Sequence, residues 1–111
     1  RKDMTALQEL LAKVEAGSKQ WTANELWEAL KCHKQKQFNA AFHGSLDAAK
    51  ALHEAVLHGW DVSMGTGHAG TFEAGVATGS RIEIFNGTSG VMSRAWLIAI
   101  IKALIAHEDA K

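Results

Sequence analysis

The amino-acid sequence predicts a mixed α/β fold of the α+β type, with helices packed on a three-stranded antiparallel sheet. Residues 45–62 carry a helix start, a helix stop and a strand start in close succession. Three short segments with strand periodicity follow, joined by glycine-rich links. Links this short favour antiparallel pairing, because a parallel connection needs a dozen or more residues. A long apolar segment ends the chain. The predicted order is α-α-α-β-β-β-α, in a single domain spanning residues 1–111.

Two capping-box patterns indicate where the first two helices begin. They lie at residues 5–8 and 22–25, each with Thr at the cap and Gln or Glu three residues later. A helical stripe of leucines follows the first box, and the second helix is expected to run to about Gln35. We expect residues 37–44 to form a connection to the third helix.

The third helix has signals at both ends. Ser45 is a favourable N-cap, because its hydroxyl accepts from free amides of the first turn. Asp47 places a negative charge at the positive end of the helix dipole. Gly59 stands where a left-handed residue commonly ends a helix.

Alternation of apolar and polar residues predicts three strands, at Trp60–Met64, Thr71–Ala77 and Arg81–Phe85. In the third, Ile82 and Ile84 are expected to face the core. Asn86-Gly87 and Ser89-Gly90 then predict turns that lead into the last helix.

The last helix, expected to be capped by Ser93 or a nearby residue, is apolar nearly all round from Trp96 to Ile105. Such a helix is covered on more than one side, and a line of small residues allows another helix to approach closely. We therefore expect a homodimer. The alternative is that the N-terminal helix covers the remaining face within one chain. The candidate interface residues are Trp21, Trp27, Ala95, Ala99 and Ala103.

Polar residues on the non-core phase of the strands form the candidate ligand site, with one histidine from a glycine-rich link. If these polar residues have a function, they could provide an acid/base pair or a surface that binds a ligand. The alternative is a solvated face with cross-strand ion pairs, each contributing about 0.2–1 kcal/mol. The residues are Asp61, Ser63, His68, Glu73, Arg81 and Glu83.

Three motifs look catalytic or ligand-binding but lack the required context. Gly65–Gly70 matches G-x-G-x-x-G, yet a strand pattern follows where a dinucleotide site needs a helix, so a hairpin loop is predicted. His53 and His58 lie five apart, about 140° around a helix, and are interpreted as surface histidines and not zinc ligands. Cys32-His33 are adjacent and do not form a dyad. We expect no catalytic residue, no metal and no cofactor.

Composition argues against several classes of partner. Lys plus Arg and Asp plus Glu number 12 each, which gives no general attraction to nucleic acid or to an anionic membrane. The apolar run at residues 95–106 is shorter than the roughly 20 residues that a membrane span needs. The single cysteine, Cys32, excludes an internal disulfide framework and fits a reducing compartment.

Three segments resemble the phage α-β-α sandwich domain, a family of small proteins of tailed phages and prophages. They are S-L-D-A-A-K-A-L at 45–52, G-W opening a strand at 59–60, and A-W-L-I-A-I-I-K-A-L-I-A at 95–106. The resemblance runs from about Met4 to Glu108, although the prolines that the family often carries before the third helix are missing here. It implies a phage or prophage accessory protein in the bacterial cytoplasm and brings no catalytic residues.

The functional interpretation is a non-enzymatic binding or interaction module whose partner is a host defence protein or a small ligand. A virion or assembly component that acts by oligomerisation is the alternative. A small enzyme with its site on the polar sheet face is the third interpretation.

Overall fold

The computed structural model describes residues 2–17, 35–66, 70–77 and 84–110. These residues form α1 (Lys2–Ala16), α3 (Gln35–Phe42), α4 (Leu46–Val56), β1 (Asp61–Thr66), β2 (Phe72–Ala77), β3 (Ile84–Ser89) and α5 (Met92–Ala110). The strands form one antiparallel sheet in the order β1-β2-β3. The predicted fold class and element order are confirmed.

The pairing of β1 with β2 places Val62 opposite Val76 and Met64 opposite Ala74. The predicted antiparallel hairpin is therefore correct, and a strand, not a helix, follows the glycine-rich link. Residues 67–69 in the middle of that link, including His68, lie outside the described part of the chain.

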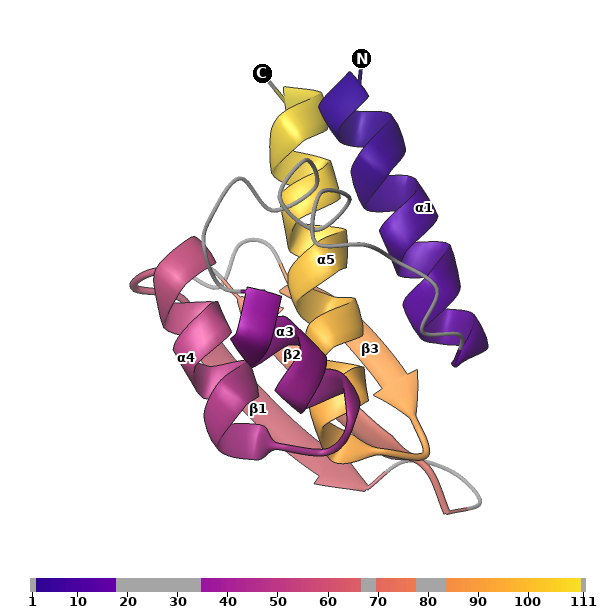
Figure 1. The fold of residues 1–111 in the computed structure, drawn as a ribbon. Helices are drawn as coiled ribbons and strands as arrows, with labels where there is room; N and C mark the ends of the chain where they lie inside the picture. Colours follow the sequence, from indigo (N-terminus) through magenta and orange to yellow (C-terminus); the bar gives the residue numbers. More distant parts are fainter. Residues whose placement is uncertain (1, 18–34, 67–69, 78–83, 111) are drawn as a thin grey trace.

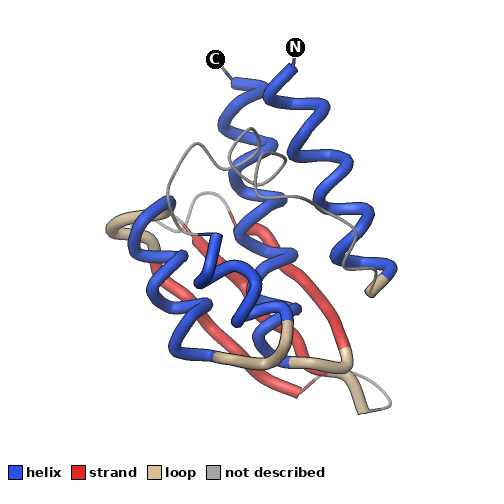
Figure 2. The backbone as a smooth tube through the Cα atoms, in the orientation of Figure 1, coloured by secondary structure: helices blue, strands red, loops and turns tan. Residues whose placement is uncertain are grey.

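The described helices lie on one face of the sheet (Figures 1 and 2). α5 packs directly on β2 and β3, and α1 packs along α5. α3 and α4 pack against each other and against α5 beside it. The described helices leave the opposite face of the sheet open, and exposed residues line it.

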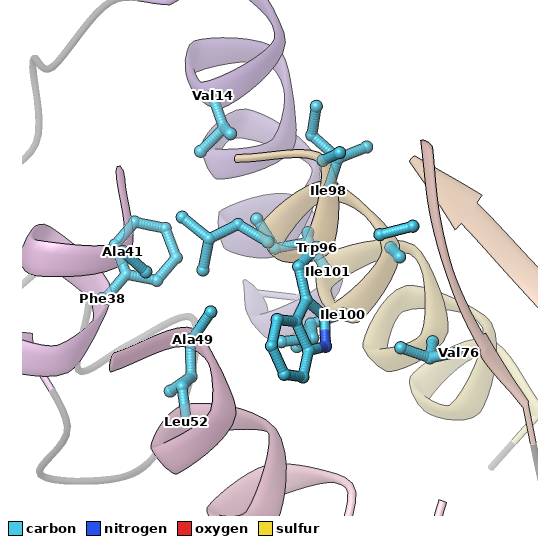
Figure 3. Packing of buried hydrophobic residues seen from close by; sticks show 14 of the residues in the cluster. Val14, Phe38, Ala41, Ala49, Leu52, Val76, Trp96, Ile98, Ile100 and Ile101 are labelled. Carbon is cyan, nitrogen blue, oxygen red and sulfur yellow. The ribbon is translucent and has the colours of Figure 1, made fainter. Parts of the chain in front are cut away.

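The core is built around α5. Trp96, Ile100 and Ile101 lie among side chains of α1, α3, α4 and β2 (Figure 3). α1 contributes buried Leu7, Leu10 and Val14, so it covers the side of α5 that the sheet leaves free. The N-terminal helix therefore covers the apolar helix within one chain, which was the alternative to a dimer at this face.

The third strand extends four residues beyond its predicted end at Phe85, and its faces are exchanged. Residues 81–83, where it was predicted to begin, lie outside the described residues. Asn86 and Gly87, expected to form a turn, lie within β3. Ile84, expected in the core, is 57% exposed on the open face, while Phe85 points to the helix side and stacks with Trp60 at 6.2 Å between ring centroids. Gly87 is responsible, because its lack of a side chain lets α5 lie against β3 at that point.

Helix α3 replaces the connection that was expected at residues 37–44. Phe38, Ala41 and Phe42 have the i, i+3, i+4 spacing of one helix face, and all three are buried. The helix ends before Gly44, whose φ of +117° suits glycine. The second predicted helix, at about residues 22–35, falls almost entirely on residues that the structure does not describe.

The start of α4 is as predicted, whereas the helix ends at Val56 with Leu57 as its C-cap, so Gly59 lies two residues after the cap and not directly after it. The Ser45 hydroxyl accepts from the amide of Ala48 at 3.1 Å, and Gly59 has a φ of +84°. His53 is a correction, because this expected surface residue is only 4% exposed. Its Nε2–H donates to the Trp60 carbonyl at 3.0 Å and its Nδ1 accepts from Trp96 Nε1–H at 3.2 Å. Both ring nitrogens are thus satisfied, which allows the side chain to be buried.

The first turn of α5 binds the last turn of α3. Ser93, expected to cap its own helix, lies inside it, and its Oγ–H donates to the Ala41 carbonyl. Arg94 Nε donates to the Phe42 carbonyl at 2.6 Å, with the guanidinium 4.0 Å above the Phe42 ring. These donors satisfy carbonyls that a helix C-terminus leaves free.

Candidate interaction site on the sheet

The open face of the sheet carries its polar residues in rows across the three strands. Ser63, Gly75 and Asn86 form the central row. In the next row, Glu73 lies between Gly65 of β1 and Thr88 of β3.

Gly75 forms the floor of this face. It is buried although no described helix covers it, because two neighbouring side chains close over it. A Cβ placed on Gly75 would lie 2.7 Å from Asn86 Oδ1 and 3.4 Å from Ser63 Oγ. The result is a shallow hollow of about 250 Å³, whose polar lining includes Ser63, Glu73 and Asn86.

A second, smaller hollow of about 60 Å³ shares Ser63 and Gly75 with the first. Asp61 and Ile84 line its far end. The two hollows adjoin at Ser63 and Gly75 and together form a shallow trough that follows β1 and β2 on the open face.

The trough can form hydrogen bonds, but its carboxylates do not form an acid/base pair. Asp61 stands opposite Ala77, whereas Glu73 stands opposite Gly65, four residues further along β1. At about 3.4 Å per residue, the two carboxylates are roughly 14 Å apart along the strand. The paired carboxyl groups of glycoside hydrolases, for comparison, are about 5–9.5 Å apart. Among the described residues, no group of three or more His, Cys, Asp and Glu could hold a metal ion.

The structure brings together only part of the predicted ligand site. Asp61, Ser63 and Glu73 lie on the open face as expected. His68, Arg81 and Glu83 lie outside the described residues. Asn86 and Thr88, which complete the face, were missed because Asn86-Gly87 has the composition of a turn and the strand was predicted to end at Phe85.

The residues of strand β1 are exposed along its whole length and on both faces of the sheet. All six of its residues are exposed. Val62 and Met64 lie on the helix side, opposite the buried Val76 and Ala74, yet they are 37% and 42% exposed. α5 packs on β2 and β3 and does not extend over β1 in the same way. Within the described residues, no further strand pairs with the outer edge of β1.

At the opposite edge of the sheet, a lysine is bonded to the backbone of β3. Lys102 reaches from α5 to β3, where its Nζ donates to the Asn86 backbone carbonyl at 3.0 Å. Lysine is a residue that native proteins place at sheet edges to prevent pairing with another chain. β1 contains neither lysine nor proline, and Asp61 is its single charged residue. In the part of the chain that the structure describes, the edge without such a lysine is therefore β1.

The alanines expected at a subunit interface are inside the chain. Ala95, Ala99 and Ala103 have no exposed surface, and the backbones of Ala95 and Ala99 lie against Gly87. They allow α5 to approach its own sheet, so they are not available to a second subunit in the folded chain. Trp21 and Trp27 lie outside the described residues.

Within the described residues, none of the helices has the length and apolar character that crossing a membrane requires. Comparison of the chain with protein-family models, with curated proteins and with solved structures finds no match.

Proposed function

We propose that this protein is a non-enzymatic interaction module that binds an extended segment of a partner protein by strand addition to β1. The observation that carries the proposal is the exposed six-residue edge strand, which has no strand on its outer side among the described residues. An unpaired edge presents free N–H and C=O groups, which are a template for another extended chain.

In this mode of recognition, main-chain hydrogen bonds give affinity and alternate side chains give specificity. On the helix side of β1, Val62 and Met64 would contact apolar residues at every second position of the segment. On the open side, Ser63 and Asp61 would face its polar residues. The preferred ligand is therefore an extended segment with alternating apolar and polar residues.

The resemblance to the phage α-β-α sandwich domain supports a biological setting for this module. We propose that the protein is a phage or prophage accessory product that acts in the host cytoplasm, with a host defence protein as the partner. Strand addition requires only an exposed extended segment of that partner, so it does not depend on a catalytic group.

A small polar ligand in the trough on the open face is the second candidate. The hydroxyl, amide and carboxylate groups of Ser63, Asn86 and Glu73 favour it. The hollow has a volume of only about 250 Å³ and is shallow. Sites for small molecules are typically clefts of about 300–1,000 Å³ that enclose most of the ligand, so the edge strand is the better-supported site.

A displayed library of random peptides tests the proposal. We expect the full chain to select peptides with alternating apolar residues, and Val62→Lys to abolish their binding. Ile84→Lys is the matched control, because it adds the same charge at an exposed apolar residue on the other edge strand and should leave binding unchanged. Selection of no peptide, or equal loss of binding in both variants, would contradict strand addition at β1.

A further inference from the structure

The edge of β1 has the sequence and charge pattern needed to pair with itself, and we propose that its occupant is a second copy of this chain. The two β1 strands would run antiparallel and join the two sheets into one. This inference rests on the proposed function, since it uses the same edge, which the second copy occupies when no segment of another partner is bound there. It also moves the expected homodimer from α5, where the alanines are buried, to β1.

Self-pairing of β1 is possible with its two faces preserved. In an antiparallel pair, residues directly opposite each other share a face. A twofold axis that passes through Ser63 places Val62 opposite Met64 of the second copy, and Met64 opposite Val62. The exposed apolar side chains of both copies then form one cluster on the helix side, while the two Ser63 hydroxyls meet on the open side.

The charges of β1 are compatible with this register. Asp61 falls opposite Gly65 of the second copy, which has no side chain. The two Asp61 residues are then four residues apart along the strands, or roughly 14 Å at about 3.4 Å per residue. This exceeds the Debye length of about 8 Å at physiological ionic strength, so their repulsion is largely screened.

The charge of the whole chain also permits association of identical copies. Lys plus Arg equals Asp plus Glu, so the formal net charge is zero at pH 7. A net charge far from zero keeps proteins monomeric through mutual repulsion, and that barrier is missing here. β1 has little charge with which to attract an oppositely charged partner, because Asp61 is its single charged residue.

The apolar surface of the described residues points to the same edge. The large hydrophobic side chains that are exposed among the described residues are Leu46, Val62, Met64 and Ile84. Two of the four, Val62 and Met64, are neighbours on one face of β1. The other edge strand, β3, has Lys102 bonded to its backbone, which opposes the same kind of pairing there.

A short strand pair buries less surface than most stable protein interfaces, so the dimer is expected to form at high protein concentration. Sedimentation equilibrium of the full chain should show a mass that rises with concentration from 12.0 kDa towards twice that value. Val62→Lys and Met64→Lys should each hold the chain at 12.0 kDa, and Ile84→Lys should behave as the unmodified chain. Circular dichroism of each variant establishes that it remains folded.

A mass of 12.0 kDa at all concentrations up to the high micromolar range would overturn self-pairing. Binding of selected peptides that depends on Val62 would then still support the proposed function, so the two failures are distinguishable. A dimer that persists in both lysine variants would place the interface elsewhere and would also overturn the inference. An isotope-filtered nuclear Overhauser contact between Val62 and Met64 of different copies would confirm the register about Ser63.

Discussion

Replacement of Gly87 by alanine tests how closely α5 lies against the sheet. A Cβ on residue 87 would lie 2.2 Å from the backbone oxygen of Ala95, 2.7 Å from Ile98 Cβ and 2.8 Å from the backbone nitrogen of Ala99. Ordinary contact begins at 3.4 Å, so α5 would have to retreat by about 1.2 Å at this point. Two of the three atoms belong to the helix backbone and cannot move away by a side-chain rotation.

The movement of α5 away from β3 should lower the free energy of unfolding by an amount that can be estimated. A radial gap of about 0.5–1 Å loses roughly a quarter to a half of the dispersion attraction between two surfaces. Insertion of an extra carbon into a packed core typically costs about 1–3 kcal/mol. Since the backbone of α5 must move as a unit, we expect Gly87→Ala to lower the free energy of unfolding by about 3 kcal/mol. The corresponding fall in Tm is roughly 10–15 °C.

Gly75→Ala is the matched control, because it adds the same methyl group to the neighbouring strand. The closest atom to the new Cβ, at 2.7 Å, would be Oδ1 of Asn86, the end of an exposed side chain that can rotate. We expect a change within about 0.5 kcal/mol. Urea unfolding of both variants, followed by tryptophan fluorescence, measures the difference. A Gly87→Ala variant as stable as the unmodified chain would refute the close packing of α5 on β3.

Three further variants and one chemical treatment test other contacts. Ala99→Glu should unfold the chain, not dissociate a dimer, because Ala99 is fully buried against Gly87; a folded monomer by circular dichroism and sedimentation would contradict this. Trp96→Phe removes the donor to buried His53 Nδ1 and should lower the unfolding free energy by at least about 1–3 kcal/mol. A smaller loss would show that this hydrogen bond is not formed. Ser45→Ala should cost about 1 kcal/mol through loss of the N-cap, measured by urea unfolding, and no loss would argue against the cap. A chelator should leave the Tm unchanged, since the described residues contain no ligand cluster, and a fall reversed by zinc would contradict this.

Local interactions made much of the fold predictable from sequence. The Ser45 cap bonds an amide three residues away, and Gly59 supplies the left-handed turn by itself. The alternation in residues 60–77 predicted two strands, and the short glycine-rich link between them predicted their antiparallel pairing. Signals of this kind act within a few residues, so a single sequence contains them in full.

Tertiary contacts account for the elements that were placed wrongly. Asn86-Gly87 has the composition of a turn, but Gly87 is needed for the approach of α5, a contact with a helix that begins further along the chain. His53 is buried because Trp96, which lies 43 residues away, donates to it. The open-face residues Asn86 and Thr88 were missed for the same reason, since the phase of β3 depends on which side meets α5.

The exposed edge could not be recognised before the sheet was known. Val62 and Met64 have the pattern of core residues, and their pairing partners Val76 and Ala74 are indeed buried. They remain exposed because α5 lies over β2 and β3. The placement of one helix relative to three strands thus decides which strand is left open.

Deuterium exchange of the β1 backbone amides, resolved by nuclear magnetic resonance, tests the role of this edge most directly. In the free chain at low concentration, the amides of residues 62–66 that point away from β2 should exchange rapidly, because the described residues offer them no strand partner. A selected peptide, or a high concentration of the chain itself, should slow the exchange of those amides. Protection of the same amides in the free chain, or protection that appears only around Gly75 on the open face, would contradict strand addition at β1.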